Sequence, residues 1–176
     1  MTMETVRKIK KAMNTLLFGL CVVIMVLLVL DVSWQVLSRY LFRQPSTFTD
    51  EVARFLMIYM SFLGGAYIFG ADGHLSVTSL RDKLPAKVKS WVIIFTYALI
   101  AAFAVIVMIF GSQRLILRTL DQPSPALGLS MGIFYMILPF SAICIVIYMV
   151  LNLIEFCATG KTANQQPEAA ELKEDD

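Results

Sequence analysis

Four long apolar stretches, separated by short polar ones, dominate the pattern of the chain. The first runs from Met13 to Leu41 and is interrupted by Asp31, and the second runs from about residue 50 to residue 70. The third covers residues 91–113, and the fourth covers residues 131–156. Each is long enough to cross the roughly 30 Å hydrocarbon core of a bilayer as a helix. The pattern therefore predicts an all-α membrane protein with four transmembrane helices.

The connection before the second stretch carries signals for the end of one helix and the start of the next. Pro45 ends the first stretch, and Thr47 or Thr49 can cap the following helix. Asp50 and Glu51 then fall in its first turn, where the helix dipole favours carboxylates. A helix is therefore expected to begin shortly after Pro45.

Two later segments depart from a simple apolar run. Residues 75–90 mix apolar and basic side chains and are split by Pro85, which predicts a short interfacial segment between the second and third helices. Pro139 lies inside the fourth stretch and leaves the carbonyl of Tyr135 without its usual donor. A bend is therefore expected in the last helix.

The composition agrees with a lipid environment. Of the 176 residues, 58% are hydrophobic and only 16% are charged, which is too apolar for a soluble domain of this size. The end of the chain is instead polar and acidic. We therefore expect a four-helix membrane domain over residues 1–160 and a disordered cytoplasmic tail over residues 161–176.

Lysine and arginine are unequally distributed between the two ends of the predicted helices. Ten lie in the N-terminal tail, the segment after the second helix and the C-terminal tail, whereas four lie at the opposite end. Arg54, within the second stretch, is the fifteenth. The positive-inside rule then places both termini in the cytoplasm and directs the connections 42–49 and 114–130 outwards. The four outward residues are Arg39, Arg43, Arg114 and Arg118.

Asp31 is an ionisable residue deep in an apolar stretch, where a charge is costly and tends to face protein or water. One interpretation is a proton or cation site, as in a self-sufficient small proton-coupled exporter. The other is a structural carboxylate that is hydrogen-bonded to a neighbour. Gln35 at i+4 is one candidate partner, and Arg39 lies a further turn away.

The second helix carries an acidic–basic pair and a strip of small residues. Glu51 and Arg54 are three residues apart on one helix face, so they can pair with each other, or one of them can reach a neighbouring subunit. Gly64 and Gly65, with other small residues nearby, favour close packing of helices. These residues are candidates for assembly rather than for chemistry.

The residues needed for catalysis or for holding a cofactor are scarce. The chain has a single histidine, His74, and three cysteines without a short metal-binding spacing. A structural zinc, an iron–sulfur cluster and a bis-histidine haem therefore lack ligands, and the membrane anchor of a redox enzyme is disfavoured. No nucleophile–base arrangement or phosphate-binding glycine loop is present. We expect neither an enzyme nor a bound cofactor, and the net charge of +2 does not suggest a nucleic-acid partner.

An ordered set of short motifs resembles a known family. The set comprises residues 50–56 (DEVARFL), 62–66 (FLGGA), 73–77 (GHLSV) and 124–128 (SPALG), with Pro139 in the last helix. It is similar to the small membrane subunit, the Q or DctQ-type subunit, of tripartite ATP-independent periplasmic (TRAP) transporters. Two positions depart from the usual pattern, because Tyr59 stands where many members have Trp and Asp50 where Glu is more usual.

The resemblance implies a division of labour within a bacterial inner-membrane transporter. A periplasmic binding protein captures an organic anion, such as a dicarboxylate or sialic acid. It delivers the anion to a large membrane subunit (the M type), which imports it by a sodium-driven elevator motion. The small subunit is implied to be a fixed scaffold beside the large one, surrounded by membrane lipids.

The same resemblance suggests roles for particular residues. Glu51, Arg54, Gly64, Gly65, His74 and Asp31 are candidates for the subunit interface or for internal structure. The outward segments 42–49 and 114–130, with their arginines, are predicted to help receive the binding protein. This places Arg39, Arg43, Arg114 and Arg118 among the docking candidates.

Overall fold

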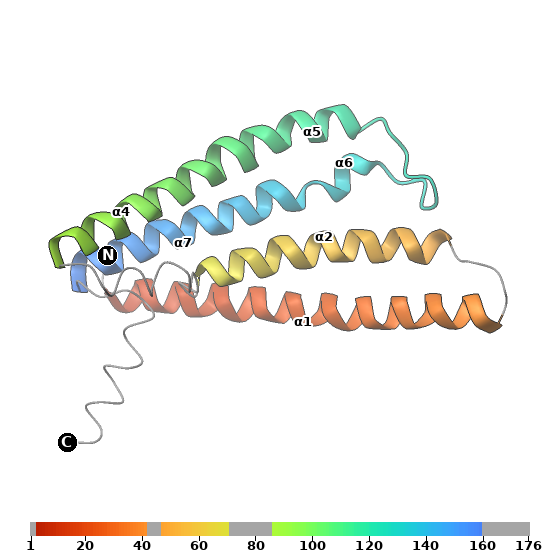
Figure 1. Cartoon of the computed structure of the whole chain (residues 1–176), viewed down its shortest axis with the longest axis horizontal. Helices are drawn as coiled ribbons and strands as arrows, with labels where there is room; N and C mark the ends of the chain where they lie inside the picture. Colours follow the sequence, from red (N-terminus) through yellow and green to blue (C-terminus); the bar gives the residue numbers. More distant parts are fainter. Residues whose placement is uncertain (1–2, 42–46, 71–85, 160–176) are drawn as a thin grey trace, which may run out of the picture.

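A computed structural model describes residues 3–41, 47–70 and 86–159 of the chain (Figure 1). Its elements are α1 (Met3–Leu41), α2 (Thr47–Gly70), α4 (Ala86–Phe103), the π-helix η1 (Ala104–Phe110), α5 (Gly111–Thr119), α6 (Met131–Phe134) and α7 (Ile137–Thr159). Within these ranges, four helical stretches are long and apolar enough to cross a membrane: Glu4–Leu41, Thr47–Gly70, Ser90–Thr119 and Met131–Ala158. The prediction of an all-α fold with four transmembrane helices is thereby confirmed.

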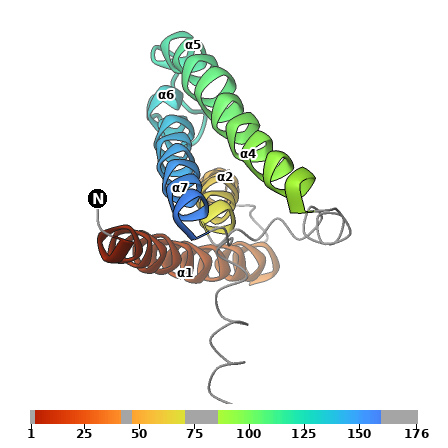
Figure 2. The same ribbon diagram turned by 90° about the vertical axis from the view of Figure 1, so that its left-hand side faces the viewer.

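The helices form two antiparallel pairs that meet at α7. α1 and α2 lie side by side, and α4, η1 and α5 together form one long arm (Figures 1 and 2). α7 packs against α1, α2, α4 and η1, so it joins the two pairs. The start of α1 and the end of α7 lie at the same end of the bundle (Figure 1). The side of the membrane that this end faces remains a prediction, as does the division at residue 160.

α1 begins at Met3, about ten residues before the apolar stretch that marked it in the sequence. Its first turns are polar but still favour a helix, because Glu4 and Lys8 form an i,i+4 ion pair at 2.9 Å. At 39 residues the helix is about 58 Å long, far more than a bilayer core requires. The membrane-embedded part of α1 is thus extended by a polar first segment.

α1 has a single buried stripe along its whole length. The buried and half-buried residues on this stripe recur at spacings of three or four, apart from the adjacent Met13 and Asn14, as on the contact face of a coiled coil. They are Val6, Lys10, Met13, Asn14, Leu17, Cys21, Ile24, Leu28, Asp31, Gln35 and Ser38. All other described side chains of α1 are exposed, so most of its surface is not covered by the part of the chain that the structure describes.

Part of the hydrophobic core lies where α1, α2 and α7 meet. Leu17, Ala66 and Tyr148 are almost fully buried there. Gly70, the last residue of α2, permits the close approach, because a Cβ atom on it would lie 2.5 Å from two ring atoms of Tyr148. Of the three glycines in α2, Gly70 is therefore the one at which an added side chain would collide with another helix.

Replacing Gly70 with alanine is expected to lower the free energy of unfolding by about 1–3 kcal/mol, because the Tyr148 ring must leave its packed position. Unfolding of the purified chain in mixed detergent–SDS micelles measures this change. Gly64→Ala and Gly65→Ala are matched controls, since a Cβ atom at either position meets nothing within 4 Å. Equal losses in all three variants would contradict the proposed collision.

The last span is interrupted rather than merely bent. α6 ends at Phe134 and α7 starts at Ile137, so a short non-helical joint precedes Pro139. The carbonyl of Tyr135 accepts a hydrogen bond from the backbone N–H of Leu138 at 3.1 Å. Pro139 has no N–H to supply the usual donor to this carbonyl, as expected, and the N–H of Leu138, one residue earlier, takes its place. The hydrogen bond from Leu138 spans three residues instead of the four of an α-helix, and it satisfies the Tyr135 carbonyl. Pro139 then lies in the first turn of α7, where proline is tolerated.

The third span is longer than the sequence indicated. The predicted stretch 91–113 lies within one continuous helical arm that runs from Ala86 to Thr119. The centre of this arm is the seven-residue π-helix η1, whose first residue, Ala104, is buried. Residues 75–85, most of the predicted interfacial segment, lie outside the described residues, and residues 86–90 form the start of α4.

Candidate functional site

The connection between α5 and α6 is a compact, hydrogen-bonded turn. The backbone N–H of Ser124 donates to the carbonyl of Leu129 at 2.8 Å, and that of Gly128 donates to the carbonyl of Ser124 at 3.0 Å. Gly128 has φ +67°, in the left-handed region that glycine adopts most readily. The N–H groups of Ala126 and Leu127 donate to side-chain oxygens rather than to backbone carbonyls of the turn.

Glu51, in the first turns of α2, supplies that acceptor. Its Oε2 accepts hydrogen bonds from the backbone N–H groups of Ala126 at 2.8 Å and Leu127 at 3.1 Å. The residue is 8% exposed. An ionised carboxylate that accepts two backbone N–H groups makes bonds stronger than neutral ones. Glu51 therefore fastens the turn at 124–128 to the start of α2.

Arg54 does not pair with Glu51. Its guanidinium forms an ion pair with the Asp50 carboxylate at 2.9 Å, and both side chains are more than half exposed. The interpretation of Glu51 and Arg54 as a mutual pair is thus corrected. Glu51 lies on the side of α2 that faces the turn, so the turn amides take its carboxylate, while Asp50 at i−4 is the more accessible partner for Arg54.

A small hollow adjoins these contacts. It has a volume of about 300 Å³ and lies between α2 and the turn with α6. Asp50, Arg54 and Phe55 line one wall, and Pro125 and Tyr135 line the other. Behind it, the Phe55 ring stacks on that of Phe134, with centroids 3.7 Å apart. Polar and aromatic contacts therefore hold α2, the turn and α6 together at this end of the bundle.

Asp31 lies on the buried stripe of α1, and its Oδ2 is buried without a hydrogen-bond partner among the described residues. Gln35, one candidate partner on the same helix, donates its amide instead to Asp50 Oδ1 at 3.3 Å. Arg39 is exposed in the last turn of α1. Asp31 is also absent from the walls of the hollow beside Arg54.

The other predicted residues are scattered. Arg114 and Arg118 are exposed on α5, and Figure 1 shows α5 and the end of α1, where Arg39 lies, on opposite sides of α2. A Cβ atom on Gly64 or Gly65 would meet nothing within 4 Å, so the predicted close packing of helices is not found at these two glycines among the described residues. His74 and Arg43 lie outside the described residues.

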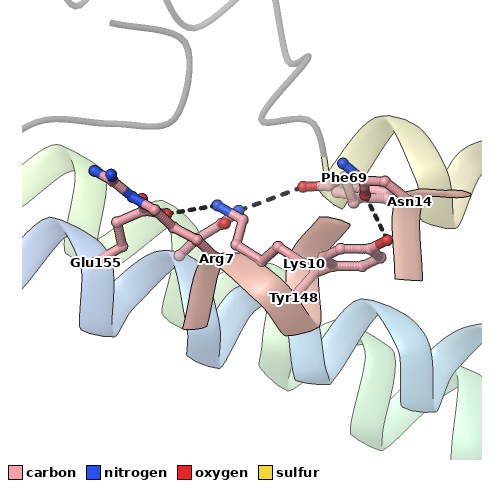
Figure 3. Close-up of polar contacts among 7 residues, drawn as sticks. Arg7, Lys10, Asn14, Phe69, Tyr148 and Glu155 are labelled. Carbon is pink, nitrogen blue, oxygen red and sulfur yellow. Dashed lines mark hydrogen bonds and ion pairs between the residues drawn. The ribbon is translucent and has the colours of Figure 1, made fainter. Parts of the chain in front are cut away.

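A second polar cluster, at the opposite end of the bundle, joins α1 to α7 (Figure 3). Lys10 Nζ lies 2.7 Å from Glu155 Oε2, and their side chains are only 11% and 5% exposed. Arg7 Nε lies 3.7 Å from the other carboxylate oxygen of Glu155. We call this contact between Lys10 and Glu155 the α1–α7 ion pair.

Further polar contacts extend the cluster into the bundle. The Tyr148 hydroxyl donates to Asn14 Oδ1 at 2.6 Å (Figure 3). The Asn152 amide donates to the carbonyl of Phe69 at 3.5 Å. Together they connect α1, α2 and α7 at one level. These residues were not singled out from the sequence, although Glu155 is the one charged residue between Met131 and Gly160.

The described residues contain no group of three or more His, Cys, Asp or Glu side chains that could hold a metal ion. Their polar side chains instead make contacts between helices. Cys21, Cys144 and Cys157 are free thiols. The chemistry that this arrangement offers is the fixing of helices to one another at the two ends of the bundle.

Comparisons with known proteins add a family to this picture. Residues 25–159 match the family model described as the DctQ component of tripartite ATP-independent periplasmic transporters. A protein of Haemophilus influenzae, named as a TRAP transporter small permease protein, is 28% identical over 148 residues, covering 84% of this chain and 91% of the relative. The sialic acid TRAP transporter small permease protein SiaQ of Vibrio cholerae is 29% identical over 104 residues, covering 58% of this chain and 60% of the relative.

Proposed function

Because the chain belongs to the DctQ component family of tripartite ATP-independent periplasmic transporters, we propose that it is the fixed scaffold of such a transporter. A small permease subunit of this family is a multi-pass inner-membrane protein. Its partners are a large membrane subunit and a periplasmic binding protein. The complex imports an organic anion of the carboxylate or sialic acid type and is driven by sodium. The Vibrio cholerae relative, which is named for sialic acid, supports that class of substrate.

The observation that carries the scaffold role is the amount of apolar surface that the bundle leaves uncovered. α1 and the arm formed by α4, η1 and α5 both carry large apolar side chains that are more than half exposed. Examples are Phe18, Leu30 and Leu41 on α1 and Phe95, Phe103 and Leu117 on the arm. Lipid covers part of such a surface, and a second membrane subunit covers the rest. Contacts fixed at both ends of the bundle keep these faces in position.

Purification of the complex tests this proposal. The tagged chain is expected to carry the large subunit with it, and proteoliposomes are expected to take up the anion only when both membrane subunits, the binding protein and an inward sodium gradient are present. Uptake by this chain alone would overturn the scaffold role. It would favour the alternative of a self-sufficient proton-coupled exporter using Asp31.

We also propose that the bundle end containing Glu51 and the turn at 124–128 faces the periplasm, with both termini in the cytoplasm. The unequal distribution of lysine and arginine supports this orientation. The exposed Arg39, Arg114 and Arg118 would then be available to the binding protein. A fluorescent protein that folds only in the cytoplasm, fused after Asp176, tests the orientation, and a dark fusion of normal abundance would contradict it.

Reversing the charge of two exposed arginines, as Arg114→Glu with Arg118→Glu, is expected to lower uptake at limiting binding protein several-fold. The reason is that charges at the rim of an interface act mainly on the rate of association. Assembly with the large subunit should be unchanged, and excess binding protein should restore uptake. The control is Arg114→Lys with Arg118→Lys, which keeps both charges. Unchanged uptake in the reversed variant would assign docking to the large subunit.

A further inference from the structure

The basic side chains at the start of α1 separate into two groups. Lys10 points into the bundle and pairs with Glu155. Lys8 and Lys11 are exposed on the other side of the helix, where they line an open hollow with Ala12, Thr15 and Leu16. Lys11 has no ion pair among the described residues, and Lys8 contacts only Glu4 in that part of the chain. Neither lysine therefore joins α1 to another helix among the described residues.

The positions of the hollow's side chains match the two parts of a phospholipid. Lys8, Lys11 and Thr15 are spaced three and four residues apart, so two ammonium groups and a hydroxyl lie along one helix face. Leu16 directly follows Thr15, and two turns further along α1 Val22 and Val23 are also exposed apolar side chains of the uncharged run. Donors suited to a phosphate thus adjoin a wall suited to an acyl chain.

We propose that Lys8, Lys11 and Thr15 bind the phosphate of an anionic phospholipid, whose acyl chains lie along the exposed face of α1. The ammonium groups supply the attraction, and the Thr15 hydroxyl donates to a phosphate oxygen. Glu4 is a weak competitor for Lys8, because both side chains of that ion pair are more than three-quarters exposed. Free phosphate shares the headgroup chemistry but gains nothing from the apolar wall.

Native mass spectrometry of the full chain in detergent, titrated with phosphatidylglycerol, tests the site. Each lysine near an anionic headgroup changes affinity about fivefold, so Lys8→Gln with Lys11→Gln should weaken binding about thirtyfold. Lys8→Arg with Lys11→Arg should retain it. Glu4→Gln should strengthen binding, because it removes the competing carboxylate. Lys161→Gln with Lys173→Gln removes the same charge elsewhere and should have no effect.

Other occupants give different results. Phosphatidylcholine with the same acyl chains should bind the wild-type chain weakly, and inorganic phosphate or glycerol phosphate should not displace phosphatidylglycerol at equal concentration. Displacement by either would show a simple anion site and overturn the lipid assignment. Residues 161–176 are acidic and could compete for the lysines. If phosphatidylglycerol binds only after their deletion, the tail is the occupant and the proposal is wrong.

Discussion

Replacing Glu155 with alanine is expected to lower the free energy of unfolding by about 3–5 kcal/mol, the larger of the two strongest effects that the structure predicts. The change leaves the ammonium of Lys10 buried without its carboxylate, and the Lys10 side chain is only 11% exposed. Arg7 is 60% exposed and can return to water. Unfolding of the purified chain in mixed detergent–SDS micelles measures the loss.

A double variant separates the cost of an unpaired charge from the value of the α1–α7 ion pair. Lys10→Met with Glu155→Met removes both charges, and we expect it to recover most of the stability that Glu155→Ala loses. The exposed pair Glu4–Lys8 is the matched control, since breaking it with Glu4→Gln should cost less than about 1 kcal/mol. If the double variant is no more stable than Glu155→Ala, the loss is one of packing rather than of charge.

Replacing Glu51 with alanine is the second large effect, with an expected loss of about 2–3 kcal/mol. Two backbone N–H groups, those of Ala126 and Leu127, lose their charged acceptor, and Leu127 keeps only the Ser124 hydroxyl oxygen at 3.2 Å. Hydrogen exchange at residues 126 and 127 should become much faster, while exchange in α7 should change little. Mass spectrometry with peptides covering 120–130 makes this measurement.

Two neighbouring variants make the Glu51 result specific. Glu51→Gln keeps one carbonyl oxygen as an acceptor without the charge, and we expect it to fall between the wild type and Glu51→Ala. Asp50→Asn breaks the exposed ion pair with Arg54 and should change stability by less than about 1 kcal/mol. If hydrogen exchange at residues 126 and 127 is equally fast in Glu51→Ala and Asp50→Asn, Glu51 does not fasten the turn to α2.

The sequence predicts the helices well because lipid imposes a simple rule on them. Every span must be apolar and long, so the four stretches could be located from hydropathy alone. Helix ends were less certain. α1 starts at Met3 because its basic residues are good helix formers, and hydropathy does not register a polar helical segment. The broken joint before α7 depends on a local rearrangement around Pro139 that a proline in the sequence does not specify.

The contacts between helices were harder to predict because their partners are far apart in the chain. Glu51 accepts hydrogen bonds from the backbone of Ala126 and Leu127, which lie 75 and 76 positions later in the chain. Every residue except proline carries a backbone N–H, so the residue types do not show which ones donate. Lys10 and Glu155 are 145 positions apart. The position of Asp31 on the inward face of α1 could have been predicted from the sequence, because Asp31 continues the spacing of three or four residues that runs through Lys10 and Leu17. That spacing assigns Asp31 to the face that packs within the chain.

The π-helix η1 changes how the arm from Ala86 to Thr119 should be aligned with related chains. A π-turn takes up one more residue than an α-turn, so the true orientation of the residues after it differs by about 100° from the one that an α-helical period gives. A helical wheel drawn through the whole arm with an α-helical period therefore assigns Arg114 and Arg118 to the wrong azimuth. A relative that lacks one residue in this segment could keep both ends of the arm in their orientation by forming a plain α-helix. Gaps in this transmembrane span can thus be structurally neutral, although gaps within spans are ordinarily taken as alignment errors.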